Sequence, residues 1–141
     1  MTVRVPAGSD PYGDFYLDEF HGTGQASAIQ LANLRDLVDN ILQPIRDWFG
    51  PVVPTSWAWW SSGEPRPGAH GTGGAVDFVV PGASLEDVHR WAAGALWGRF
   101  GELGREPDHI HVTLPPLGGT NDVWVQDEAG RFSRPAWFYE L

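Results

Sequence analysis

Two histidine-containing segments carry residue types at a spacing that suits catalysis. The first reads His70-Gly-Thr-Gly-Gly-Ala-Val-Asp77, and the second, about thirty residues later, reads Pro107-Asp-His-Ile-His111. Together they offer two imidazoles and a carboxylate for one metal ion, with a second carboxylate beside the last imidazole. A zinc hydrolase needs this set: three protein ligands, an open fourth position and a general base.

The local sequence indicates how the first ligands would meet. The stretch after His70 is rich in glycine, and residues 75–80 are rich in valine, as in a buried strand. We therefore expect a loop that folds His70 back over Asp77. An unpartnered Asp in such a strand would be costly to bury, so without a metal Asp77 is expected to face water at a strand edge or to pair with an Arg.

The second segment leaves two assignments open. His109 and His111 are two residues apart, so on a strand they share a face, and one binds the metal while the other lines the site. Asp108 acts as general base only if the turn set by Pro107 brings it to the site. Glu106 is the rival base, an alternative that requires His109 to be the ligand.

The two segments resemble the motifs of a known family. His70, Gly73, Ala75 and Asp77 match the H-x-x-G-x-A-x-D signature of the zinc D-Ala-D-Ala carboxypeptidases, and Asp108-His-Ile-His111-Val is similar to their D-H-x-H-V motif. That family includes D-alanyl-D-alanine dipeptidases and phage endolysin peptidases and shares the hedgehog/DD-peptidase fold. The resemblance covers roughly residues 15–114. It implies Zn²⁺ held by His70, Asp77 and His111, with Asp108 as base and His109 as a catalytic residue lining the site.

One departure from the family concerns substrate binding. Family members carry an Arg after the first core strand, but here that stretch reads Thr55-Ser-Trp-Ala-Trp-Trp-Ser61. Arg66 is the candidate replacement, although an exposed loop arginine is the favoured interpretation. The tryptophans of this stretch are interpreted mainly as packing, with Trp59 the candidate for stacking on substrate. His89 is interpreted as solvated or at a core edge, and His21 as a turn residue.

Periodicity predicts the elements that would position these residues. Apolar residues at helical spacing predict a helix over 27–49, interrupted at Pro44, and a second helix over 84–100 that Ser84 begins as an N-cap. Strands are expected within 52–60 and over 75–80 and 110–114, a loop over 61–74 and a hairpin over 122–131. We therefore predict one α+β domain with a small, mostly antiparallel sheet and flanking helices. Its parts are an irregular arm (1–14), a zinc peptidase-like region (15–114) and a C-terminal hairpin and tail packed on it (115–141).

Composition excludes several classes of protein. The chain has 141 residues, no cysteine and a net charge of -9, and its basic residues are nine scattered arginines. Disulfides and thiolate metal sites are therefore excluded. Nucleic acid is not an expected partner, because no basic patch is present. Neither a signal peptide nor a membrane span is visible, so no membrane contact is expected.

Two functions follow from the resemblance. The first is a zinc-dependent peptidase that hydrolyses peptidoglycan stem or cross-link peptides, encoded by a phage as an endolysin released through a holin or as a virion-associated enzyme. A cytoplasmic dipeptidase is a lesser expectation. The second is a non-catalytic virion or tail component that keeps the fold and metal site and contacts other virion proteins.

Overall fold

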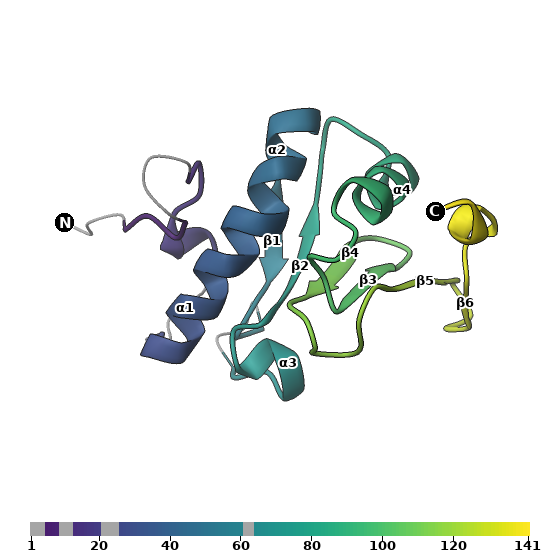
Figure 1. Cartoon of the computed structure of the whole chain (residues 1–141). Coiled ribbons are helices and arrows are strands. Elements are labelled where there is room, and N and C mark those ends of the chain that lie inside the picture. The colour runs from purple at the N-terminus through teal and green to yellow at the C-terminus, as the bar shows by residue number, and fades with distance from the viewer. Residues whose placement is uncertain (1–4, 9–12, 21–25, 61–63) are drawn as a thin grey trace.

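The computed structural model describes residues 5–8, 13–20, 26–60 and 64–141 (Figure 1). His21 lies outside these residues. The helices are α1 (Ala28–Leu37), α2 (Gln43–Phe49), α3 (Gly68–Gly71) and α4 (Leu85–Ala95). The strands are β1 (Val53–Ser56), β2 (Ala75–Val79), β3 (Glu102–Arg105), β4 (Ile110–Thr113), β5 (Asp122–Gln126) and β6 (Phe132–Ser133). Two 3-10 helices span Leu17–Glu19 and Ala136–Glu140.

A capping box begins the first long helix. Ser27 Oγ accepts from the backbone N–H of Gln30, and the side chain of Gln30 accepts from the N–H of Ser27. The predicted interruption at Pro44 takes the form of a π-helical segment, Val38–Leu42, between α1 and α2. Pro44 has no N–H for the helical hydrogen bond to the carbonyl of residue 40, which lies in this π segment. α2 ends at Gly50, whose φ is 99°.

The six strands form one mixed sheet of order β1-β2-β4-β3-β5-β6. β3 and β5 run parallel, whereas the other neighbouring pairs are antiparallel. The expectation of a mostly antiparallel sheet is therefore corrected. β5 follows β4 after a short connection and so runs opposite to it. Because β2 already pairs with the other edge of β4, β5 adds beyond β3, whose direction it shares.

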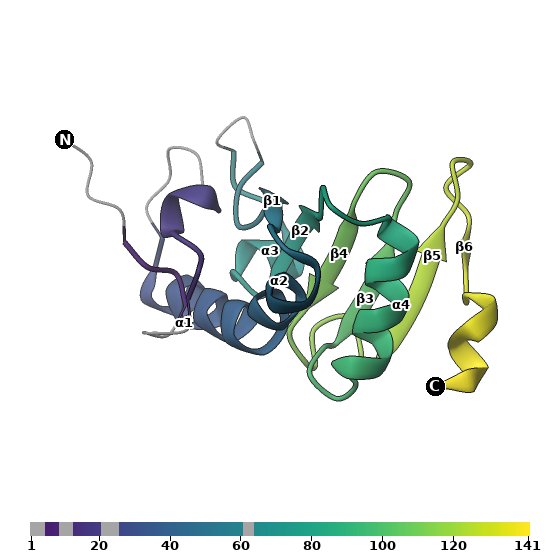
Figure 2. The same cartoon turned by 90° about the horizontal axis from the view of Figure 1, so that it is seen from above.

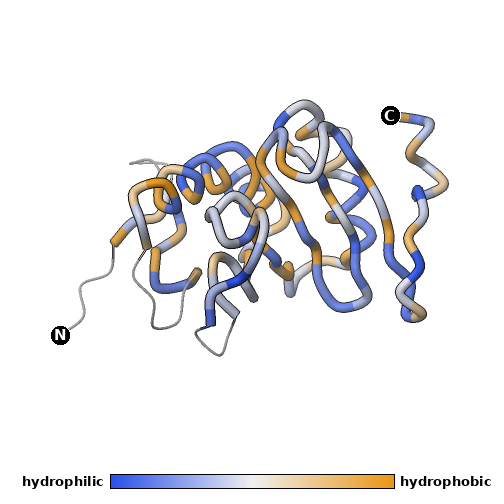
Figure 3. Tube along the Cα trace, turned by 90° about the horizontal axis from the view of Figure 1, so that it is seen from below, coloured by the Kyte–Doolittle hydropathy of each residue, from blue (hydrophilic) through white to orange (hydrophobic). Residues whose placement is uncertain are grey.

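The hydrophobic core lies between one face of this sheet and the helices. Val76, Phe78, Ile110 and Val112 are fully buried there, together with residues of α1, α2 and α4. Figure 2 shows these three helices along one side of the sheet. Alternate strand residues point to the opposite face, which no long helix among the described residues covers. Figure 3 shows this alternation as hydrophilic and hydrophobic segments along the strands.

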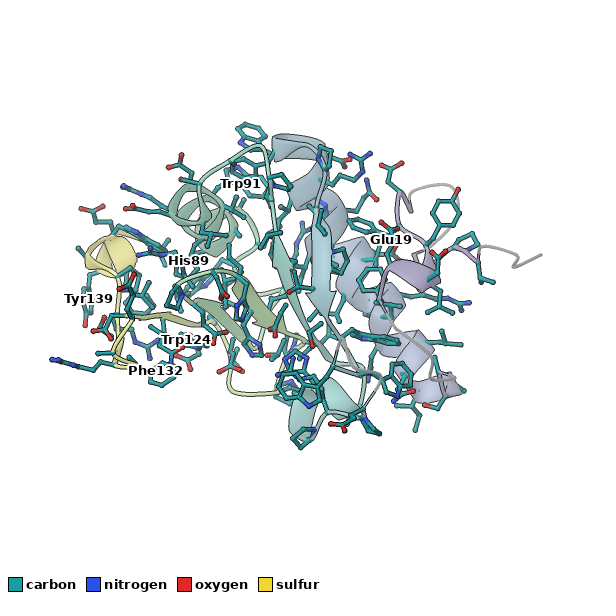
Figure 4. All side chains as sticks on the ribbon, turned by 180° about the vertical axis from the view of Figure 1, so that it is seen from behind. Glu19, His89, Trp91, Trp124, Phe132 and Tyr139 are labelled. Atoms are coloured by element: carbon teal, nitrogen blue, oxygen red, sulfur yellow. The ribbon has the colours of Figure 1, made fainter. Side chains whose placement is uncertain are left out.

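Three local expectations change. The predicted loop over 61–74 contains the single helical turn α3, which carries His70. β3 was not predicted, because Glu-Leu-Gly-Arg has little strand character. His89 is fully buried on α4 (Figure 4). Its Nε2 lies 3.0 Å from the carbonyl oxygen of Leu103, and its ring packs against Trp137 of the C-terminal 3-10 helix. Ser84 caps α4 as expected, accepting from the N–H of Asp87.

No helix in the described ranges is both long and apolar enough to cross a membrane.

Candidate metal centre

The central strands bring the three expected metal ligands together on the open face of the sheet. Asp77 on β2 lies directly opposite His111 on β4, so their side chains share this face. α3 brings His70 to them from the side. His70 Nε2, Asp77 Oδ1 and His111 Nδ1 form a triangle with separations of 3.4, 2.9 and 3.3 Å. These three side chains form a group that could hold a metal ion.

The size of this triangle fits a tetrahedral ion. Zinc bound to nitrogen or oxygen at ~2.0–2.2 Å in tetrahedral geometry requires ligand atoms roughly 3.3 Å apart. All three residues are also shielded from water, since their side chains are 7%, 10% and 14% exposed in the order His70, Asp77, His111. The group therefore fits the cofactor that the sequence predicts in ligand type, spacing and burial.

Each imidazole turns one nitrogen toward the other two ligands and the other nitrogen toward an outer partner. The Nδ1 of His70 lies 2.9 Å from the carbonyl oxygen of Trp57 and 3.0 Å from Nη1 of Arg66. Its Nε2 faces Oδ1 of Asp77 and Nδ1 of His111. For His111 the roles are reversed: Nε2 donates to Glu102 Oε1 at 2.6 Å, which leaves Nδ1 for a metal. Such outer partners commonly fix the orientation of metal-binding histidines.

Two pKa values reflect the proximity of these groups in the metal-free protein. Burial alone would lower the pKa of His111, but hydrogen bonds and charge interactions with Asp77 and Glu102 outweigh it and raise the pKa to about 9. Burial would raise the pKa of Asp77, yet hydrogen bonds from His111 and His70 hold it well below the ordinary range. A proton on His111 thus occupies the position that a metal would take, and metal binding would release it.

Arg66 reaches the site although its sequence context favoured an exposed loop residue. Its side chain is only 14% exposed, and Nη1 donates to Asp77 Oδ2 at 2.9 Å and to Ser56 Oγ at 2.8 Å. The guanidinium also lies over the ring of Trp60, 4.0 Å from its centre. Because Arg66 occupies Oδ2, it leaves Oδ1 of Asp77 facing the two histidines.

Trp59, the candidate for stacking on substrate, belongs instead to the core. It is 8% exposed and packs edge-on against the buried Trp57, with ring centres 5.6 Å apart. Trp57 in turn donates from Nε1 to the carbonyl of Gly73, which anchors the loop after His70. These two indoles therefore help to fix the position of the loop that follows His70.

The turn before β4 separates the two candidate bases. The N–H of Glu106 bonds to the carbonyl of His109 at 2.9 Å, and this tight turn points Asp108 outward. The Asp108 side chain is 87% exposed, and its Oδ1 contacts Nδ1 of His109 at 2.6 Å. Glu106 Oε2 lies 2.6 Å from the other ring nitrogen, Nε2, which is 3.7 Å from Asp77 Oδ2. Glu106 therefore lies toward the ligand cluster, and Asp108 lies on the far side of the His109 ring.

Glu106 and His109 also form a second acidic group with Asp77 that could hold a metal. This group has a single histidine and is less buried than the first, with Glu106 26% and His109 23% exposed. His70, Asp77 and His111, with two histidines and lower exposure, are therefore the better candidate group.

A groove of about 640 Å³ opens beside His111. Its lining includes Glu102 and Glu106 on the metal side and Trp124, Phe132 and Arg134 from the C-terminal hairpin. Glu102 and Trp124 were not singled out from the sequence. The only available signal was a Trp flanked by valines, which indicates a strand but no site.

Comparison with known proteins gives no match: no family model fits the chain, and neither a curated protein nor a solved structure resembles it.

Proposed function

We propose that this protein is a zinc-dependent peptidase that hydrolyses peptide bonds of peptidoglycan stems or cross-links. The observation that carries the proposal is the triangle of Nε2 of His70, Oδ1 of Asp77 and Nδ1 of His111, at tetrahedral spacing and with a carboxylate beside it. The substrate class and the phage origin rest on the resemblance of the two motifs. The groove beside His111 supports a peptide substrate, because it can hold a stretch of extended peptide next to the three candidate ligands.

A zinc ion held by the three ligands would polarise the scissile carbonyl and make water a stronger acid. The remaining chemistry belongs to side chains of this chain. Glu106 accepts a proton as water oxygen bonds to the carbonyl carbon, and it returns that proton to the amine nitrogen as the carbon–nitrogen bond breaks. His109, which contacts Glu106 through Nε2, orients that carboxylate. Asp108 holds Nδ1 of the same ring.

The proposal departs in one role from the family motif, in which Asp108 is the base. The sequence allowed Glu106 as base only with His109 as the ligand. In the structure a Glu106 oxygen lies within 4.8 Å of an Asp77 oxygen, so we propose Glu106 as base with His111 as the ligand. The exposed position of Asp108 and the 2.6 Å contact of Glu106 with the inner side of His109 favour Glu106. Arg66, the candidate replacement for the family's substrate-binding Arg, is engaged with Asp77. We propose that its charge holds Asp77 in position, and that substrate binding depends on the groove.

The test is hydrolysis of purified peptidoglycan with and without a chelator. The reaction is monitored through the new amino groups that hydrolysis releases. We expect parent activity that chelation abolishes and zinc restores. Glu106→Gln should lose on the order of 100- to 10,000-fold in rate, the usual effect of removing a general base, while binding zinc normally. Asp108→Asn should retain much more activity, and the reverse order of the two variants would return the base to Asp108.

A zinc-loaded parent that cleaves no wall substrate would refute the enzyme proposal. The non-catalytic virion component would then be the better proposal, and copurification with tail or head proteins would be its test.

A further inference from the structure

One row of residues crosses five strands on the open face of the sheet. Ser56 lies opposite Asp77, Asp77 opposite His111, His111 opposite Gly104, and Gly104 opposite Trp124. Directly opposed residues point to the same face. The row therefore joins two expected metal ligands to a tryptophan of the C-terminal hairpin, with a glycine between them.

Gly104 provides the space through which Trp124 reaches the metal ligands. A Cβ atom at position 104 would overlap the six-membered ring of Trp124. The indole therefore lies across Gly104, with its ring centre 6.0 Å from that of His111 and an angle of 32° between the two planes. Phe132 of β6 packs edge-on against the outer side of the same indole at 5.1 Å (Figure 4).

The polar atom of Trp124 points to the partner of His111. Trp124 Nε1 donates to Glu102 Oε2 at 3.2 Å, and the other carboxylate oxygen, Oε1, accepts from His111 Nε2 at 2.6 Å. Both oxygens of Glu102 are thus engaged, and the Trp124 N–H fixes the rotation of the carboxylate that keeps Oε1 against the imidazole.

We propose that Trp124 is a positioning residue of the metal centre, acting through Glu102 on His111, and that the C-terminal hairpin is thereby part of the site. The inference rests on the proposed metal centre and deepens it. Without the N–H of Trp124, Glu102 turns more freely and holds the His111 ring less firmly. The metal then binds to a less organised ligand set and with lower affinity.

The experiment measures zinc affinity of the full chain by competition with a chromophoric chelator. Glu102→Ala should weaken zinc binding about 10- to 100-fold, as loss of outer-shell partners does. Trp124→Phe keeps an aromatic ring but removes the N–H, and should weaken binding roughly 3- to 10-fold, the effect of one hydrogen bond. Matched controls are Trp97→Phe and Glu128→Ala, both at exposed positions outside the ligand group and the groove lining, and both should bind zinc as the parent does.

The double variant separates positioning from general packing. If Trp124 acts through Glu102, Trp124→Phe should cause no further loss of affinity in the Glu102→Ala background. Equal losses in both backgrounds would overturn the proposal, and so would parent-like affinity of Trp124→Phe. Gly104→Ala gives an independent test, since it should displace the indole and reproduce the Trp124→Phe loss.

Failure of this inference and failure of the proposed function give different results. Zinc binding that depends on Trp124 without peptide hydrolysis supports the inference and refutes the peptidase. Peptide hydrolysis by a protein whose zinc affinity does not depend on Trp124 supports the peptidase and refutes the inference. A parent chain that binds no zinc refutes both.

Discussion

Two imidazoles and one carboxylate face one another in this protein because their other polar atoms are already occupied. Trp57 takes the outer nitrogen of His70, Glu102 takes that of His111, and Arg66 takes the outer oxygen of Asp77. Each of these partners comes from a different part of the chain. The ligand atoms are therefore organised in the absence of metal, which lowers the cost of binding one.

Replacing the two histidines of β4 and its preceding turn should have opposite effects on metal content. His111→Ala removes one of three ligands and should leave substoichiometric zinc after dialysis, whereas the parent should hold about one zinc per chain. His109→Ala should retain nearly all the metal, because His109 lies outside the triangle of His70, Asp77 and His111. Elemental analysis of both variants is the measurement. Zinc loss from His109→Ala with full retention by His111→Ala would show that the ligand is His109 and that our assignment of His111 is wrong.

Acid should destabilise the protein through His89 before it affects the carboxylates of the site. Burial lowers the pKa of His89 from 6.5 to about 4, so the unfolded chain binds more protons than the folded one between these values. The stability this gives is full above pH 6.5 and declines as the pH falls toward 4. The full loss is on the order of 3 kcal/mol.

Urea unfolding at several pH values tests this prediction. The His89→Gln variant can still donate to the carbonyl of Leu103 but does not titrate. We expect its free energy of unfolding to change much less than that of the parent between pH 6.5 and 4.5. Parallel pH profiles of the two proteins would show that His89 is not responsible.

Among the glycines of the loop after His70, Gly73 is the one whose lack of a side chain matters most for the position of the loop. Gly73 has a φ of +79°, and a Cβ atom there would lie 2.7 Å from the backbone Cα of Gln30 in α1. α1 also holds this loop through Gln30 and Asn33, whose amides donate to the carbonyls of Gly71 and Thr72. The position of His70 is therefore set by the first helix as well as by α3.

Gly73→Ala should accordingly lower both stability and zinc affinity. Gly98→Ala is the matched control, because Gly98 also has a positive φ, +89°, but open space around it. We expect a cost of roughly 1–3 kcal/mol from the backbone conformation in both variants and a larger cost in Gly73→Ala. Only Gly73→Ala should bind zinc more weakly. Thermal melting and chelator competition measure the two effects, and equal behaviour of the two variants would contradict the role of α1.

The sequence was most informative where one residue type has few structural uses. His70, Asp77 and His111 could be grouped in advance because the motifs specify their order and spacing. The strands expected over 75–80 and 110–114 contain Asp77 and His111, and the structure has them as β2 and β4. The longer helices followed from periodicity, and the start of α4 followed from the capping residue Ser84.

The rest depended on pairings between distant segments. Arg66 looks like an exposed loop residue until the chain returns and places it beside Asp77. Glu102 and Trp124 gain their roles only because β3 lies between β4 and β5, an arrangement that local pattern does not encode. The orientation of Asp108 likewise follows from a single turn hydrogen bond, that of Glu106 to His109.

Chelation should reduce the thermal stability of the whole domain. The ligands come from α3, β2 and β4, so a bound metal links elements that unfold together. Zinc at a free concentration 100 times its Kd would add about 2.7 kcal/mol to the free energy of unfolding. Differential scanning calorimetry should therefore show a melting temperature several degrees lower with a chelator. His111→Ala is the control, and its melting temperature should not respond to zinc. An identical melting temperature of the parent with and without chelator would argue against a formed site.

The row of opposed residues from Ser56 to Trp124 also bears on the rates of folding and unfolding. His70 and Asp77 are separated from His111 by 41 and 34 positions in the chain. Contacts of such separation form only once the sheet is largely assembled. Zinc would then bind a state reached after the folding barrier, so it would leave the folding rate nearly unchanged and slow unfolding. The metal would then extend the lifetime of the folded protein.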